Sequence, residues 1–197
     1  FQILKKCIGA DAWKLKFFQF VNCYFCSMTK ILLLSDTHSH IDGKILKYAR
    51  QADEIWHAGD IGSLAVTDAL RKIKPVRAVY GNIDDHEIQR EFPLNLRFQC
   101  EEVDVLMTHI GGYPPNYNPR CRNLIVSDPP TLFICGHSHI LKVMWDKNRE
   151  VLHMNPGACG KYGFHQVRTM LRFVIDGKNI KHLEVVELGK RGQTVDP

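Results

Sequence analysis

The chain of 197 residues lacks most features that mark membrane, fibrous or nucleic-acid-binding proteins. Its aromatic-rich stretch, residues 17–26, is interrupted by amides and is shorter than the roughly 20 apolar residues that cross a bilayer. The sequence contains no internal repeats and no low-complexity segments. We therefore expect a globular domain without membrane contact, and a hydrophobic content of 45% is enough to fill a sizeable core.

A broad basic surface is also lacking. Residues 1–27 hold four lysines and one aspartate of the chain's 26 basic and 21 acidic residues, which leaves 22 basic and 20 acidic residues in the remainder. Because nucleic acid binding draws on clustered Lys and Arg, the near-neutral remainder argues against a nucleic-acid partner. A small anionic substrate is still allowed.

The seven cysteines lack the regular spacing of a disulfide framework, and their number is odd. We expect reduced thiols in a cytoplasmic protein, with Cys100, Cys121, Cys135 and Cys159 as small core residues. The single Cys-x-x-Cys motif at residues 23–26 has no second pair. We interpret it as chance rather than as a redox or zinc site.

Residues 1–27 differ in character from the rest and are predicted to lie outside the fold. A signal peptide is the alternative, because lysines precede the aromatic stretch, but no Ala-x-Ala-like cleavage site follows. Met28 leads straight into the first predicted strand and is the expected natural start, which the intact mass of the native protein would test. We expect one domain over residues 28–188 and a frayed tail over residues 189–197.

From residue 30 onward, apolar runs of strand length alternate with helical patterns, and strands dominate after residue 95. The strands are predicted at residues 30–34, 54–58, 76–80, 96–100, 103–108, 132–135, 141–145, 150–153, 169–175 and 179–188. The helices are predicted at residues 43–52, 64–73, 84–90 and 120–126, and a turn at residues 155–157. A mostly parallel sheet facing a mostly antiparallel one, with helices outside, would bury both sets of strands. The sequence thus predicts an α/β fold, a four-layer α/β/β/α sandwich.

Five of the apolar runs stop on polar residues of the types that bind metal ions. Alternation along the first strand is expected to point Asp36 and His38 the same way from its carboxyl end. Since open α/β sheets bind ligands at that edge, we expect the five strand ends to form one site. The loop at residues 111–119 is expected to be a lid or substrate wall. The candidate ligands are Asp36, His38, Asp60, Asn82, His109, His137 and His139.

These candidates comprise two carboxylates, four imidazoles and one amide carbonyl. Seven ligands exceed what one ion with an open position can use, but they suit two ions that share a carboxylate. Two divalent cations against two carboxylates leave a charge of about +2, which favours an anionic phosphate ester as substrate. Each residue alone could cap a helix or lie at the surface, so the joint pattern carries the argument.

Five motifs resemble those of the calcineurin-like metallophosphoesterase superfamily. They are Asp36-Thr37-His38, Gly59-Asp60, Gly81-Asn82-Ile83-Asp84, Thr108-His109 and Gly136-His137-Ser138-His139. The short chain, the turn at residues 155–157 and the closing hairpin look most like the small prokaryotic YfcE-type phosphodiesterase branch. The resemblance covers about residues 30–188 and implies a metal-dependent phosphodiesterase with the four-layer fold.

The resemblance also implies a ligand set for each of two metal ions, with Asp60 bridging them. The first set would be Asp36, His38, Asp60 and His139, and the second Asp60, Asn82, His109 and His137. A hydroxide between the ions would attack phosphorus in line, which makes Asp60, Asn82 and His109 the expected catalytic residues, and Asn82 could also bind a phosphoryl oxygen. Manganese is the expected metal, with iron, nickel and zinc as alternatives, because availability decides in mixed sites.

One position departs from the superfamily pattern. The motif Gly-Asn-His-Asp carries a histidine that contacts phosphate and can protonate the leaving oxygen, and this chain has Ile83 there. Losing a general acid costs about 10²- to 10⁴-fold when the leaving group is poor. We therefore expect weak activity on alkyl monoesters and better activity on diesters or aryl esters. His40 and His86 could substitute as the acid, and His40 is also a candidate substrate-binding residue.

The main alternative to an enzyme is a scaffold. A eukaryotic retromer subunit has the implied fold, also lacks the motif histidine and binds proteins, so the fold alone does not prove catalysis. The complete ligand set favours an enzyme acting on a small phosphate ester, and the near-neutral charge disfavours a nuclease. A neighbouring subunit could cover the site, so a homo-oligomer is possible.

Overall fold

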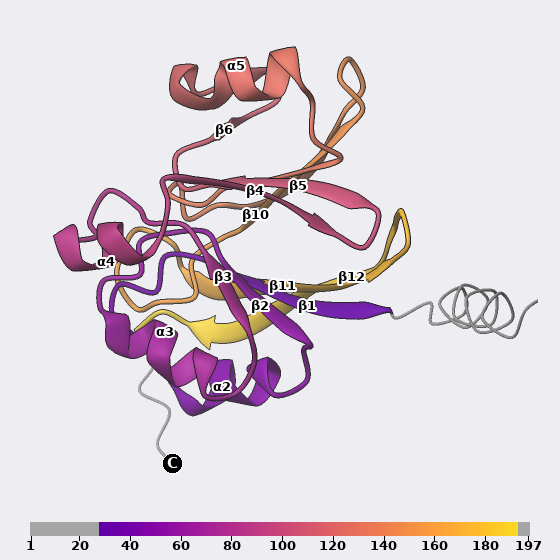
Figure 1. Ribbon diagram of the computed structural model, residues 1–197. Coiled ribbons are helices and arrows are strands. Elements are labelled where there is room, and N and C mark those ends of the chain that lie inside the picture. Colours follow the sequence, from indigo (N-terminus) through magenta and orange to yellow (C-terminus); the bar gives the residue numbers. More distant parts are fainter. Residues whose placement is uncertain (1–27, 193–197) are drawn as a thin grey trace, which may run out of the picture.

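The structure, a computed structural model, describes residues 28–192 as two facing β-sheets with helices on the outer faces (Figure 1). The predicted extension at residues 1–27, with its Cys-x-x-Cys motif, lies outside the described residues, as do residues 193–197 of the predicted tail. Among residues 28–192, no helix has the length and apolar character needed to cross a membrane.

Each of the two large sheets has five strands. The first sheet has the order β12-β11-β1-β2-β3, and the second has the order β4-β5-β8-β10-β9. The strands of the first sheet are β1 (Thr29–Leu34), β2 (Glu54–His57), β3 (Val76–Ala78), β11 (Val167–Asp176) and β12 (Asn179–Lys190). Those of the second sheet are β4 (Asn95–Cys100), β5 (Val103–Thr108), β8 (Leu132–Ile134), β9 (Leu141–Asp146) and β10 (Val151–Pro156).

Both sheets are mixed, so the expectation of one mostly parallel and one mostly antiparallel sheet is wrong. In the first sheet, β2 runs parallel to both β1 and β3, while β11 runs antiparallel to β1 and β12. In the second sheet, β8 runs parallel to β5 and β10, which pair antiparallel with β4 and β9. The closing hairpin of β11 and β12 pairs with β1, and β8 lies between the β4–β5 hairpin and the β9–β10 hairpin.

Three hydrophobic cores separate the four layers. Side chains alternate along β1, so that Leu32 and Leu34 pack beneath the helices of the first sheet while Ile31 and Leu33 pack between the sheets. A third core, which includes Phe133, lies between the second sheet and the helix at residues 119–127. These side chains are at most 1% exposed. The predicted four-layer α/β/β/α sandwich is confirmed.

The helices begin where polar side chains cap them. Within residues 28–192 they are α2 (Gly43–Ala49), α3 (Leu64–Arg71), α4 (His86–Glu91) and α5 (Pro119–Ser127). Their first-turn backbone N–H groups donate to the side chains of Asp42, Ser63, Asp85 and Asn118 respectively. Helices α2 and α3 cover the first sheet, and α5 covers the second (Figure 1).

The predicted loop at residues 111–119 contains a small two-stranded hairpin, β6 (Gly112–Tyr113) and β7 (Asn116–Tyr117). Its register pairs Gly112 with Tyr117. The proline and glycine content of the segment predicts turns, and it gives no signal for two-residue strands.

Two other boundaries differ from the predictions. Asn155 and Pro156, expected in a turn, end β10, where they pair with β9. A proline is tolerated there because the pairing of β10 with β8 ends at Met154, which leaves Pro156 with a partner strand on one side only. Strand β12 continues to Lys190, and Gly189 pairs with Arg168. The predicted boundary at residue 188 is therefore too early, because pairing with β11 extends the strand.

Candidate metal centre

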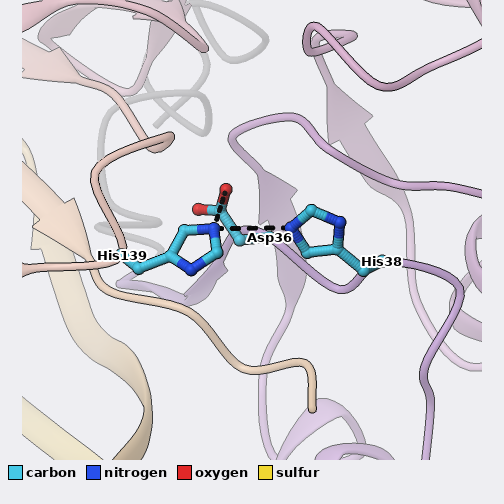
Figure 2. A group of neighbouring side chains, drawn as sticks. All are labelled: Asp36, His38 and His139. Carbon is cyan, nitrogen blue, oxygen red and sulfur yellow. Dashed lines mark hydrogen bonds and ion pairs between the residues drawn. The ribbon is translucent and has the colours of Figure 1, made fainter. Parts of the chain in front are cut away.

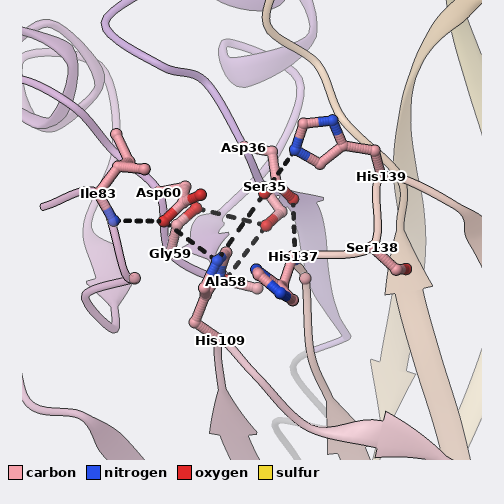
Figure 3. A network of polar contacts seen from close by, with 12 residues as sticks. Ser35, Asp36, Ala58, Gly59, Asp60, Ile83, His109, His137, Ser138 and His139 are labelled. Atoms are coloured by element: carbon pink, nitrogen blue, oxygen red, sulfur yellow. Dashed lines mark hydrogen bonds and ion pairs between the residues drawn. The ribbon is translucent and has the colours of Figure 1, made fainter. Parts of the chain in front are cut away.

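The loops that follow five strands meet at one edge of the two sheets (Figure 3). This convergence brings six of the seven predicted ligands into two compact groups. Asp36 and His38 follow β1, Asp60 follows β2, Asn82 follows β3, His109 follows β5, and His137 and His139 follow β8. The ligands therefore come from both sheets.

The first group, shown in Figure 2, consists of Asp36, His38 and His139. The second consists of Asp60, His109 and His137. Within each group, one ligand atom per residue lies within 4.8 Å of the others. Three ligands from imidazole and carboxylate are a common donor set for a catalytic transition metal.

The two groups adjoin each other through their carboxylates. Nε2 of His139 lies 3.2 Å from Oδ1 of Asp36 in the first group, and Nε2 of His109 lies 3.1 Å from Oδ1 of Asp60 in the second. Across the groups, Nε2 of His38 lies 3.8 Å from Oδ2 of Asp60, and Nε2 of His109 lies 4.0 Å from Oδ1 of Asp36. Each carboxylate is thus within reach of a histidine of the other group.

Two buried atoms of these groups, Oδ1 of Asp36 and Nε2 of His109, make no well-oriented hydrogen bond, although each has a nitrogen or oxygen of the site within 3.2 Å. Nδ1 of His109 lies 2.8 Å from the carbonyl oxygen of Ala58, which can only accept, so Nδ1 carries the ring proton of the neutral imidazole. The lone pair of Nε2 then faces the carboxylate oxygen of Asp60. Such an arrangement needs positive charge between the two atoms, which either a proton or a divalent cation supplies.

The pKa shifts of the site also indicate that positive charge is favoured there. Burial lowers the pKa of His109, but the carboxylates of Asp60 and Asp36 outweigh this effect and raise it above its ordinary value. Burial raises the pKa of Asp60, but a protonated His109 ring, the backbone N–H of Ile83 and the charge of His38 together lower it below its ordinary value. Burial lowers the pKa of His38 and His137, which keeps these imidazoles neutral and able to donate a lone pair at neutral pH.

Most of the candidate ligands have left-handed backbone conformations. The φ angles are 55° at Asp36, 46° at His38, 54° at Asp60, 67° at His137 and 57° at His139. Such residues cost about 1–3 kcal/mol each and cluster at functional sites. Strand β1 ends at Leu34, so the expectation that alternation along the strand directs Asp36 and His38 is wrong. Left-handed turns direct them instead.

Asp84, which the sequence analysis left without a role, joins two of the loops. Its carboxylate accepts hydrogen bonds from the backbone N–H groups of Ile61 at 3.1 Å, Gly62 at 2.7 Å and Gly81 at 2.7 Å. The side chain is 3% exposed. Asp84 is the last residue of the Gly-Asn-x-Asp motif, and its place in that motif is the sequence feature that could have indicated its role. It holds the loop carrying Asp60 against the loop carrying Asn82.

Two glycines are required by close approach at the site. A Cβ atom on Gly81 would overlap Oδ1 and the backbone nitrogen of Asp60. At Gly59, where φ is +90°, a Cβ atom would lie 2.6 Å from Nδ1 of His109. Both glycines let the backbone pass directly behind a candidate ligand.

Asn82, the amide among the candidate ligands, lies next to His109 of the second group. Its side chain is exposed and lines a cavity of about 140 Å³ together with His109 and Arg120. Arg120 lies in α5, and the sequence analysis assigned it only to a helix. A guanidinium at this position adds positive charge next to the predicted metal site.

Of the three residues considered around the missing motif histidine, Ile83 and His40 have other contacts and His86 is exposed. Ile83 is 45% exposed, and its backbone N–H donates to Oδ1 of Asp60 at 3.2 Å. Nε2 of His40 lies 3.1 Å from Oδ2 of Asp42, the cap of α2. His86 is the first residue of α4 and is exposed. The substrate-binding role of His40 stays a prediction, as does an acid role for either histidine.

A second cavity, of about 310 Å³, opens next to His137. Gly112 and Tyr113 of the small hairpin line it, as does Lys142 of β9, whose Nζ lies 3.5 Å from the centre of the Tyr113 ring. The segment at residues 111–119 therefore lies where a substrate wall was predicted, and its contact with substrate stays a prediction.

The histidines at 57 and 153 lie inside β2 and β10 and are structural. Nε2 of His57 lies 2.9 Å from the hydroxyl of Thr37, and its Nδ1 accepts from the backbone N–H of Gly59 at 3.2 Å. Nε2 of His153 lies 3.1 Å from the carbonyl oxygen of Gly112. Both side chains are at most 1% exposed.

Comparison with known families gives a match over most of the chain. The model of the calcineurin-like phosphoesterase superfamily domain matches residues 29–178. A probable metallophosphoesterase of Methanothermobacter thermautotrophicus is 29% identical over 131 residues, which cover 64% of this chain and 74% of that protein. The matched region contains all seven predicted ligands.

Solved structures share the fold at low identity. A novel archaeal phosphodiesterase has a TM-score of 0.61 and 22% identity, covering 81% of this chain and 99% of that one. Wild-type Vps29 of Entamoeba histolytica, complexed with zinc, has a TM-score of 0.63 and 16% identity, covering 80% of this chain and 98% of that one. These likenesses establish the fold, which an enzyme and a vacuolar sorting protein share.

Proposed function

Because the chain belongs to the calcineurin-like phosphoesterase superfamily, we propose that it hydrolyses phosphodiesters with two divalent cations held by the seven predicted ligands. One observation carries the proposal. Two groups of three ligands adjoin through Asp36 and Asp60, and Oδ1 of Asp36 and Nε2 of His109 are buried without a well-oriented hydrogen bond. A protein without a cation function gains nothing from such an arrangement, because unpartnered buried groups cost stability.

Each side chain has a distinct part in this proposal. Asp60 would hold a cation jointly with His109 and would serve the first subsite as well, while the N–H of Ile83 orients its carboxylate. Asn82 and Arg120, at the cavity beside His109, orient the phosphoryl group through hydrogen bonds and charge. When bound, the cations lower the pKa of a shared water toward about 7 and polarise phosphoryl oxygens.

The preference for diesters and aryl esters follows from the absence of the motif histidine. Ile83 stands in the place of the motif histidine. It offers only its backbone N–H, which donates a hydrogen bond to Asp60. His40 is engaged by Asp42. Without a proton donor, the leaving group must depart as a stable anion, which aryl oxides do more readily than alkoxides.

The metal, the substrate, the location and the assembly belong to the same proposal. We propose manganese as the metal and a small phosphate ester as substrate, its organic part occupying the cavity of about 310 Å³ beside His137. A reducing cytoplasm as location is supported by free buried thiols at Cys100, Cys121, Cys135 and Cys159. A homo-oligomer, in which a second copy covers the site, is the proposed assembly.

A scaffold is the second candidate, because Vps29 shares the fold. Zinc accompanies that structure, so binding of a metal does not by itself separate the two functions. Hydrolysis of a phosphodiester would separate an enzyme from a scaffold.

The test combines elemental analysis with a panel of alkyl and aryl mono- and diesters. We expect two metal ions per chain, turnover of aryl diesters, and loss of nearly all turnover in Asp60→Asn. The matched control is Asp68→Asn, which changes an exposed carboxylate of α3. A wild-type protein that holds metal and hydrolyses none of the esters would support the scaffold and end the proposal.

A further inference from the structure

The segment from Gly160 to His165 lies against the first ligand group. The backbone N–H of Gly160 donates to the carbonyl oxygen of Asp36 at 3.1 Å. The ring of Tyr162 lies 5.4 Å from the ring of His38, measured between centroids. The sequence analysis assigned no role to any residue of this segment, which joins β10 to β11.

His165 connects this segment to His139 through a chain of two hydrogen bonds. Nε2 of His165 lies 3.1 Å from the carbonyl oxygen of Gly160, and its Nδ1 lies 3.3 Å from Nδ1 of His139. A carbonyl can only accept, so in the neutral His165 ring Nε2 carries the proton and Nδ1 carries a lone pair. Nδ1 of His139 must then be the donor, which leaves Nε2 of His139 without a proton.

That Nε2 is the atom that faces the first subsite. It lies 3.2 Å from Oδ1 of Asp36 and 3.4 Å from Nε2 of His38 (Figure 2). A histidine binds metal through an unprotonated nitrogen, and the partner of its other nitrogen selects the tautomer.

The backbone of the segment also packs against His139. Gly163 has a φ of +120°, and a Cβ atom at this position would overlap Nδ1 of His139. The ring centroids of His139 and His165 are 5.2 Å apart at an interplanar angle of 74°. The approach of Gly163 and the edge contact of His165 together restrict the orientation of the His139 ring.

We propose that His165 is a positioning residue that holds His139 in the tautomer and orientation that bind a cation at the first subsite. The proposal rests on the two-metal site of the proposed function. In the second group, His109 receives the same support from the backbone carbonyl of Ala58. Removing the His165 side chain therefore weakens one subsite and leaves the other intact.

The first experiment is calorimetric titration of metal-free protein with manganese. In His165→Phe we expect one of two binding events to weaken by about 10- to 100-fold and the other to stay unchanged. His165→Gln, whose amide oxygen can accept from Nδ1 of His139, restores part of that loss. The matched control His182→Phe changes an exposed histidine of β12 and leaves both events unchanged. Equal weakening of both events, or of neither, overturns the proposal.

The second experiment needs no metal and no activity. Imidazole ¹⁵N chemical shifts of the metal-free wild type at pH 8 should place the proton of His139 on Nδ1, and His165→Phe should move the population toward Nε2. A wild-type His139 protonated at Nε2 overturns the proposal even when no variant folds. A protein that binds no manganese but has the expected tautomer refutes the proposed function alone.

Discussion

At the level of single residues, the site depends on backbone atoms that lie directly against carboxylates and imidazoles. Five of the six residues in the two ligand groups have positive φ angles, and Asp84 ties their loops by three backbone hydrogen bonds. Left-handed conformations are costly, so the surrounding contacts must hold them in place. The glycines behind the ligands are the most sensitive positions.

Gly81→Ala should disrupt the second ligand group. The added Cβ would overlap Oδ1 and the backbone nitrogen of Asp60, and neither can move without displacing the candidate bridging carboxylate. We expect a loss of about 1–3 kcal/mol in the free energy of unfolding. Urea unfolding and elemental analysis measure the loss of stability and of metal.

The matched control is Gly43→Ala at the start of α2, where no atom lies within 4 Å of the new Cβ. That variant should gain about 0.4–1 kcal/mol, because alanine reduces the entropy of the unfolded chain. Equal effects of the two substitutions would mean that the space behind Asp60 is not constrained.

At the level of elements, the existence and type of the helices and strands can be predicted well, because periodicity and capping are local properties of the sequence. The four helices of the described part begin within two residues of their predicted starts, next to the caps at Asp42, Ser63, Asp85 and Asn118. The sheet partners of β8 and β11 could not be predicted, since pairing across distant segments leaves no mark in either sequence. The loop conformations could not be predicted either. Strand alternation suggested the direction of the Asp36 side chain, but a left-handed turn determines it.

The cap of α5 offers a test at this scale. The side chain of Asn118 accepts a hydrogen bond from the N–H of Arg120 at 3.0 Å. Asn118→Ala should therefore cost about 1 kcal/mol of stability in thermal or urea unfolding. It should also raise KM for the diester, because α5 carries Arg120 to the cavity beside His109.

Asn123→Ala, within the same helix, is the control. Its side chain is exposed, and alanine is the better helix former, so stability should stay the same or rise slightly. A larger loss for Asn123→Ala than for Asn118→Ala would contradict the role of the cap.

At the level of the whole molecule, the four layers could be predicted because each apolar strand face needs a partner. Two histidines, His57 and His153, are buried inside the sandwich, where protonation of the ring would destabilise the folded protein. Burial lowers the pKa of His57 and of His153 to about 4. Both rings accept or donate hydrogen bonds as neutral groups.

Stability should therefore decrease as the pH falls from about 6.5 toward 4. The unfolded chain binds a proton at each histidine near pH 6.5, whereas the folded protein does so only near pH 4. The contribution of the two neutral rings is complete above pH 6.5 and declines by up to about 1.4 kcal/mol per pH unit for each histidine. Urea unfolding of metal-free protein at pH 7, 6 and 5 measures this decline, and equal free energies at pH 7 and pH 5 would contradict it.

The most direct test of the central claim is a crystal structure of the manganese-loaded protein with anomalous data at the manganese edge. We predict two anomalous peaks about 3.5–4 Å apart, as in other two-metal sites, one beside Asp36, His38 and His139 and one beside Asp60, His109 and His137. No peak at these residues, or a single peak at saturating manganese, would contradict the account.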